Sequence, residues 1–344
     1  MPEAALSDVS EKSVSPDARS WLAVAAPILV ASYVFGSLVV PGLRGNADEQ
    51  IVSPCEGVSA TLAVASVLFL AMEVVGRGGT LSSARGGAPL SRIFAVSVSG
   101  VVLALAFAAV AFRLHPLLAM GLSVAAAAVC LSCASGALSV PESRAGSLLL
   151  VAMSMTSLSR TFGWQLAFLA GERADRFLFG VSHYALSAST LLEALGQIMA
   201  IAWLGTRGPW RGRLLTNVAV VAAFVATFLA ARALSSHSGS VVTRVFATAI
   251  ARVLHSYVPL SPLSAFLGVS APLLALVSIV QSRRNAPYAG CVALLLCSRG
   301  TFDVPLSALA SVVAGLVLLD TRLRSTSASI QPYKDTPEVT PNEP

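Results

Sequence analysis

Apolar residues occur along the chain in long runs separated by short polar links. Many of the runs are about 18 to 25 residues long, which is the length at which an α-helix crosses a bilayer. The pattern therefore predicts an all-α, polytopic integral membrane bundle of about ten transmembrane helices, within a range of about eight to eleven. We expect spans at about 21–41, 58–75, 93–112, 117–140, 147–170, 179–204, 214–234 and 259–281, and two shorter spans within 286–320.

Composition supports this class and indicates an orientation. Hydrophobic residues make up 55% of the chain and charged residues only 12%, whereas a soluble domain has roughly 25% charged residues. The net charge of +6 comes mostly from arginine, and the short loops 76–92, 205–213 and 282–285 are rich in this residue. Arginine-rich loops on one side are typical of membrane proteins, so we expect a multi-pass protein of the cell membrane with both termini in the cytoplasm. This distribution argues against nucleic acid as a partner, and the lipid bilayer is the expected one.

Three segments are expected along the chain. Residues 1–20 and 325–344 are polar and are predicted to be disordered cytoplasmic tails on either side of a transmembrane domain at 21–324. A signal peptide is the competing interpretation of the N-terminus, but the apolar run at 21–41 is longer than a usual signal core. The segment 241–257 carries Arg244 and Arg252 in an otherwise apolar helix. We expect it to be an amphipathic helix in the outer interface.

The transmembrane domain has the pattern of two duplicated halves, about 58–171 and 179–320. The segment SRTFGWQLAFLA (159–170) resembles SRGTFDVPLSALA (298–310), and 59–79 resembles 187–208 at a similar offset. Duplicated halves are common in transporters. Chance alignment of apolar runs remains the alternative.

Smaller features are assigned on spacing alone. Residues 42–57 are expected to form an external loop that contains Arg44 and Glu56. Glu73 stands four residues before Arg77, which predicts an interfacial ion pair on one helix face.

Ionisable residues inside two consecutive spans are the strongest functional signal. Arg160 lies in the span 147–170 and Glu193 in the span 179–204, and a short charged link makes the two spans neighbours. Charge at membrane depth is costly, so the two side chains are expected to pair, directly or through water or Tyr184. A structural clamp between helices and a proton or substrate route are both compatible with this pair.

Other polar residues extend the predicted intramembrane route. Arg299 and Asp303 have helical spacing around a helix break at SRGTFDVP (298–305). Gln165 and Gln197 lie in the same two spans as the first pair and are expected to bond across helices.

The four histidines all fall at the predicted external face. Histidine is the commonest metal ligand and an axial ligand of haem, so a shared haem or copper site is one hypothesis, although no pair has the spacing of a local metal motif. His183 is the best single ligand, because Glu193 lies on the same span. The four residues are His115, His183, His237 and His255.

The remaining chemistry is sparse. Cys130 and Cys133 form a CxxC inside an apolar run, where two small packing residues are commoner than a zinc or redox site. The chain has no nucleotide-binding, hydrolase or metalloprotease motif in a plausible setting. An enzyme is therefore not favoured.

One stretch resembles a known family. The segment HYALSASTLLEALGQIMAIAWLGTRGPWRGR (183–213), with Arg232 after it, is similar to part of the NnrS-type membrane proteins. This resemblance covers about a third of the chain and implies haem or copper binding and relief of nitrosative stress, with His183 as the one corresponding residue. Tyr184 follows the histidine here, and SRTFGWQ (159–165) stands in place of the family's Gly-His-Thr-Gly segment.

Three functions are therefore compatible with the sequence. The first is a transporter or permease with Arg160, Glu193, Arg299 and Asp303 along a polar route. The second is a haem- or copper-binding membrane protein. The third is a non-catalytic subunit or scaffold that associates with other membrane subunits and uses the charges as clamps.

Overall fold

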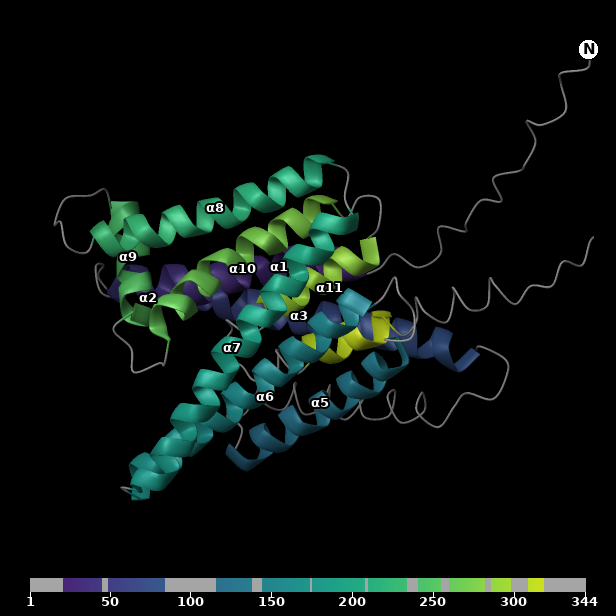
Figure 1. The fold of residues 1–344 in the computed structure, drawn as a ribbon, viewed down its shortest axis with the longest axis horizontal. Helices are drawn as coiled ribbons and strands as arrows, with labels where there is room; N and C mark the ends of the chain where they lie inside the picture. Colours follow the sequence, from purple (N-terminus) through teal and green to yellow (C-terminus); the bar gives the residue numbers. More distant parts are fainter. Residues whose placement is uncertain are drawn as a thin grey trace, which may run out of the picture.

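The fold is a bundle of helices, and the described part of the chain contains no strand. The structure, a computed structural model, describes residues 21–44, 49–83, 116–137, 144–173, 175–207, 210–233, 241–254, 260–281, 286–297 and 309–318. Figure 1 shows the bundle with its longest axis horizontal. The helices are α1 (Leu22–Val34), η1 (Phe35–Val39), α2 (Val40–Leu43), α3 (Glu49–Ser83), α5 (Pro116–Ala137), α6 (Arg144–Arg173), α7 (Arg176–Arg207), α8 (Trp210–Ala233), α9 (Val241–Leu254), α10 (Ser261–Gln281) and α11 (Ala286–Cys297). A further helix, Leu309–Leu318, follows them.

Several of these helices are long and apolar enough to cross a membrane. Within the described residues, five stretches meet both conditions: Leu22–Leu43, Glu49–Glu73, Arg176–Leu204, Gly212–Arg232 and Ser261–Gln281. The all-helical class is confirmed for the described residues, and these stretches indicate a membrane protein. α6 is also long, but Arg160 and several hydroxyl residues lower its hydropathy. The predicted span 93–112 and the two predicted tails lie outside the described residues.

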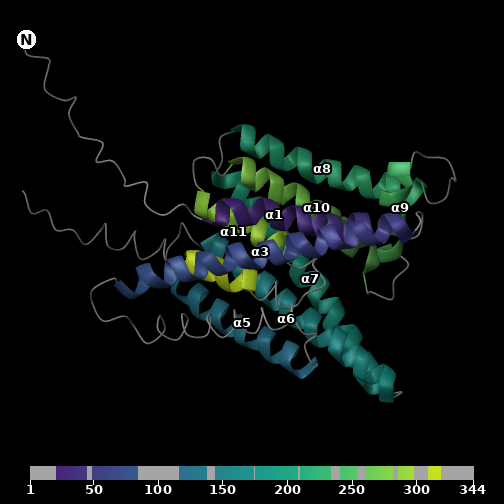
Figure 2. The same cartoon turned by 180° about the vertical axis from the view of Figure 1, so that it is seen from behind.

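α1 and α3 form an antiparallel pair that runs across the bundle in Figure 2. At one end the Glu73 carboxylate, which is buried, accepts a hydrogen bond of 3.2 Å from the backbone N–H of Leu22 in the first turn of α1. A carboxylate at this position satisfies a free N–H and favours the positive end of the helix dipole. Trp21 stacks on Phe69 beside it, with ring centroids 5.9 Å apart. Glu73 thus joins two helices, which its spacing to Arg77 did not indicate; the side chain of Arg77 lies outside the described residues.

The prediction of a loop at 42–57 is wrong over its second half, because residues 49–57 are helical. α3 begins at Glu49 and continues to Ser83, beyond both ends of the predicted span 58–75. A helix satisfies its own backbone in lipid and in water alike, so it does not have to end where the apolar run ends. An exposed ion pair of 2.7 Å joins Arg44, at the end of α2, to Glu56 in α3.

α6 and α7 form a long hairpin whose closed end extends beyond the other helices in Figure 1. The two helices come close where a glycine on one of them faces a larger side chain on the other. A Cβ atom on Gly163 would stand 2.7 Å from Leu186 Cγ, and a Cβ atom on Gly196 would overlap the Met153 sulfur. Ser159 Oγ also donates a hydrogen bond of 2.7 Å to the carbonyl oxygen of Ala185. This close approach sets which side chains meet in the middle of the hairpin.

The centre of the bundle is formed by apolar residues from the C-terminal helices. The described side chains of α11 and all of Leu309–Leu318 are buried. α10 packs between α11 and α8 and also contacts α1 and α7. α9 lies at the end of the bundle where α2 and α8 end (Figure 1). The duplicated halves stay a prediction, because most of 298–310 lies outside the described residues.

Candidate functional site

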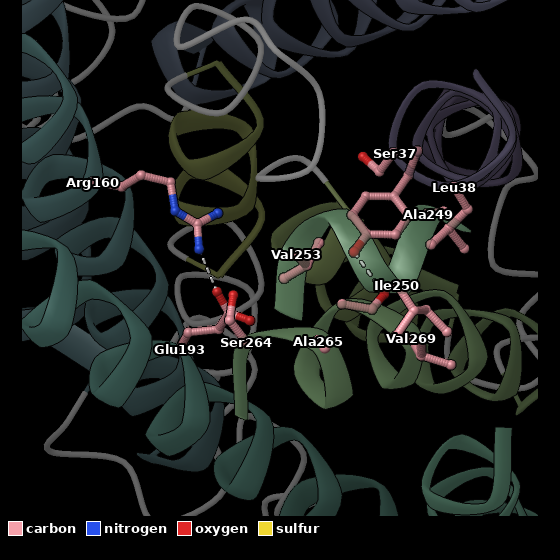
Figure 3. Close-up of a pocket in the computed structure, with 12 residues that line it drawn as sticks. Ser37, Leu38, Arg160, Glu193, Ala249, Ile250, Val253, Ser264, Ala265 and Val269 are labelled. Carbon is pink, nitrogen blue, oxygen red and sulfur yellow. Dashed lines mark hydrogen bonds and ion pairs between the residues drawn. The ribbon is translucent and has the colours of Figure 1, made fainter. Parts of the chain in front are cut away.

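The structure brings Arg160 and Glu193 into direct contact. Arg160 Nη2 and Glu193 Oε2 are 2.6 Å apart (Figure 3). Each residue lies near the middle of its own helix, so the pair forms half-way along the α6–α7 hairpin. Tyr184 does not intervene, because its side chain is 77% exposed. The two charges that the sequence places in neighbouring spans thus neutralise one another, as charges at membrane depth must.

The two partners differ in their exposure. The Glu193 side chain is 3% exposed and the Arg160 side chain is 28% exposed. Both border a cavity of about 160 Å³ that lies between α1, η1, α6, α7, α9 and α10. The carboxylate therefore lies deep in the wall, whereas the guanidinium presents part of its surface to the cavity. A ligand in the cavity could therefore contact the positive charge of Arg160.

A second polar contact lies one helical turn further along α7. Gln197 Nε2 donates a hydrogen bond of 2.8 Å to the carbonyl oxygen of Leu267 on α10. Its Oε1 atom accepts a hydrogen bond of 2.5 Å from Ser270 Oγ. Gln197 therefore forms hydrogen bonds between helices, as expected, and it connects α7 to α10 one turn beyond the ion pair.

α10 contains Pro272, which lies one turn beyond Gly268 in the cavity wall. Proline has no N–H group, so the carbonyl oxygen of Gly268, four residues earlier, loses its usual helical partner. The buried hydroxyl of Tyr33 on α1 donates a hydrogen bond of 2.7 Å to this oxygen. Pro272 thus frees an acceptor in the cavity wall, and a side chain from another helix satisfies it.

The backbone of the first span is also irregular at the cavity. Residues Phe35–Val39 form a π-helical turn that ends two residues before Pro41, and Ser37 within this turn lines the cavity. A π turn inside an α-helix is rare and occurs frequently at functional sites. In a membrane, irregular backbone is tolerated where it is buried in protein or lines a hydrated cavity. The π-helical turn and the Gly268 carbonyl group that Pro272 leaves without its helical partner thus border the same cavity.

The remaining lining is small and mostly apolar. Figure 3 shows the ion pair on one side of the cavity and Ile250 and Val269 on the other. Hydroxyl groups come from Tyr33, Ser37 and Ser264, and the charged groups in the wall are Arg160 and Glu193. The apolar and backbone surface comes from Leu38, Ala249, Ile250, Val253, Ala265, Gly268 and Val269.

Not every predicted site residue joins this cavity. Gln165 is half-buried on α6 and is not part of the cavity wall. Arg299 and Asp303 lie outside the described residues, so their pairing stays a prediction.

The haem or copper hypothesis rests mainly on residues that the structure does not describe. His183 is exposed on α7, ten residues before Glu193. His115, His237 and His255 lie outside the described residues. No group of three or more His, Cys, Asp or Glu side chains among the described residues has the geometry of a metal site. Cys130 and Cys133 are free thiols buried in the apolar core.

Sequence reasoning missed the contribution of α1, α9 and α10 to this site. Tyr33, Ser37 and Ser264 are ordinary residues in apolar runs, and no charge or motif marks them. The one feature of the sequence that could have indicated these helices is proline, because Pro41 and Pro272 each remove a backbone donor inside an apolar span.

Comparison of the chain with protein-family models, with curated proteins and with solved structures finds no match in any of the three.

Proposed function

We propose that this protein is a transporter of small solutes in the cell membrane, and that the cavity beside Arg160 and Glu193 is its substrate site. The observation that carries the proposal is the position of the ion pair in the wall of a cavity that α1, η1, α6, α7, α9 and α10 border. A clamp that only joined two helices would need no cavity beside it. Secondary transporters commonly build their substrate sites where the backbone hydrogen bonding of a membrane helix is broken, as it is in the π-helical turn and at Pro272 here.

The proposed topology keeps about ten spans with both termini in the cytoplasm. α1 then begins at the cytoplasmic side, and Ser37 and α9 lie toward the external side. α9 is proposed to lie in the outer interface, which the burial of its side chains supports. Val245, Ala249 and Ile250 are buried against the bundle, whereas Arg244 and Arg252 are exposed. The cavity under α9 would therefore take its substrate from outside the cell.

Glu193→Gln is expected to abolish gradient-driven solute uptake while the protein remains folded. Glutamine keeps an oxygen that can accept a hydrogen bond from Arg160, but it can neither carry charge nor exchange a proton. The purified protein is reconstituted into vesicles, and uptake of radiolabelled small organic anions, organic cations and neutral solutes is compared with uptake by protein-free vesicles. Wild-type vesicles should accumulate at least one solute class, and Glu193→Gln vesicles should not.

The matched control is Glu172→Gln, the same substitution at an exposed position near the end of α6. This variant should transport as the wild type does. The proposal fails if the wild type moves none of the three solute classes above the protein-free rate. If Glu193→Gln instead prevents folding, as judged by gel filtration and helical circular dichroism, the clamp of a subunit or scaffold is the correct account.

A further inference from the structure

We propose that the substrate is a small organic monoanion and that it binds together with one proton, with Arg160 holding the anion and Glu193 holding the proton. This inference rests on the proposed function and adds the class of the substrate and its coupling ion. It follows from the charges of the site, from the exposure of its two partners and from the size of the cavity.

The balance of charge requires the proton. With Glu193 ionised the pair is neutral, and an anion that enters beside it leaves a net negative charge inside the bundle. When Glu193 is protonated, Arg160 and the bound anion form the neutral pair instead. A proton alone would leave Arg160 uncompensated, since a guanidinium does not lose its charge in proteins. Each ligand therefore strengthens the binding of the other, and this coupling is reciprocal.

Geometry assigns the anion to Arg160 rather than to another group. Its guanidinium borders the cavity with 28% of its side chain exposed, whereas Glu193 is 3% exposed behind it. A guanidinium binds a carboxylate through two parallel N–H···O hydrogen bonds. The carboxylate of the substrate would thus replace the carboxylate of Glu193 at the same cation. The proton on Glu193 is taken up from the solution on the side where the anion enters, and it is released with the anion on the other side.

The volume of the cavity limits the size of the part of the substrate that is attached to the carboxylate. A cavity of about 150 Å³ holds one benzene molecule, and this one is about 160 Å³. Ile250, Val253 and Val269 offer apolar contact, and the hydroxyls of Ser37 and Ser264 can bond a polar substituent. These dimensions suit a short monocarboxylate with a few carbon atoms, with or without a hydroxyl group.

Few other groups can titrate near Glu193. In the described part of the chain, α6 contributes Arg160 and α1 contributes Tyr33, whose hydroxyl donates to Gly268. The residues of α9 that line the cavity are apolar, and α10 contains no ionisable residue. α8 has its arginines only near its two ends. Glu193 is therefore the group at this site that takes up a proton when the pH falls.

The experiment measures binding and proton uptake by calorimetry on the full-length protein in lipid nanodiscs. The probes are acetate, propionate and lactate, each compared with its neutral amide. We expect at least one acid to bind about tenfold or more tightly than its amide, and to take up about one proton per molecule. The dependence of the binding enthalpy on the ionisation enthalpy of the buffer gives the proton number. Affinity should fall by about tenfold per pH unit once Glu193 is ionised in the free protein.

Two variants separate the roles. Glu193→Gln should bind the acid with no proton uptake and with an affinity that does not change with pH. Arg160→Gln should lose the preference for the acid over the amide. The inference is overturned if no acid binds, if the amides bind as well as the acids, or if the wild type takes up no proton.

Failure of this inference and failure of the proposed function give different results. Binding in nanodiscs does not require transport, so acid binding with proton uptake but no vesicle uptake contradicts only the transport function. Vesicle uptake of a cation or a neutral solute, with no acid bound, leaves a transporter whose substrate is of another class.

Discussion

Glu193→Leu is expected to destabilise the folded protein by about 3 kcal/mol or more, and Arg160→Leu by clearly less. Removal of one partner of a buried ion pair leaves the other without compensation. The asymmetry arises because the remaining groups differ. A glutamic acid left alone can take up a proton and become neutral, whereas an arginine left alone stays charged. Unfolding in mixed micelles, titrated with sodium dodecyl sulfate and followed by tryptophan fluorescence, measures both costs.

The double variant Arg160→Leu/Glu193→Leu should recover most of the lost stability, because an apolar pair replaces an ionic one. Glu172→Leu, at an exposed position near the end of α6, serves as the control and should cost little. Equal effects of the two single variants, or additive effects in the double variant, would mean that the two side chains do not neutralise each other.

Gly42→Ala is expected to be the most disruptive small substitution at the end of the bundle where α2 and α9 meet. A Cβ atom at this position would overlap the carbonyl oxygen and carbonyl carbon of Val245 on α9. Backbone atoms cannot rotate away as a side chain can, so α9 has to move as a unit. Such overpacking costs about 1 to 3 kcal/mol. Because α9 contributes Ala249, Ile250 and Val253 to the cavity wall, substrate affinity should fall as well.

Thermal unfolding in detergent measures this effect against Gly57→Ala on α3, where a Cβ atom would have nothing within 4 Å. The control should be neutral or slightly stabilising, because alanine favours a helix by about 1 kcal/mol over glycine. If both variants melt at the wild-type temperature, α2 and α9 do not pack as closely at Gly42 as the structure shows.

The class of the protein and the Arg160–Glu193 pair could be predicted from the sequence, because the first depends on the length of the apolar runs and the second on a short link between two spans. The length of the apolar runs determines which segments can cross a bilayer. The short link at 174–175 makes α6 and α7 antiparallel neighbours. Arg160 and Glu193 lie at similar distances from this link on its two sides, so they meet at the same depth. Long-range topology was not needed for this contact.

The rest of the site depends on contacts between segments that are distant in sequence. Tyr33 meets Gly268, and Gln197 meets Ser270, with no local pattern that relates them. Apolar runs without charge also carry no information on which face of a helix points inward. The burial of Glu73 against the start of α1 was missed for the same reason, because spacing relates a residue only to its own helix.

The central claim is that lipid surrounds the outer faces of these helices while water and ligand reach the cavity within. A cysteine at Ser37, which lines the cavity, is compared with a cysteine at Val64, which is 40% exposed on α3. The background is Cys55→Ser, which leaves four buried native cysteines. Cell membranes are treated with a membrane-impermeant, anionic methanethiosulfonate. The account predicts that Ser37→Cys reacts and that Val64→Cys does not, because its thiol faces acyl chains. Equal reaction of both variants, or reaction of Val64→Cys alone, would contradict it.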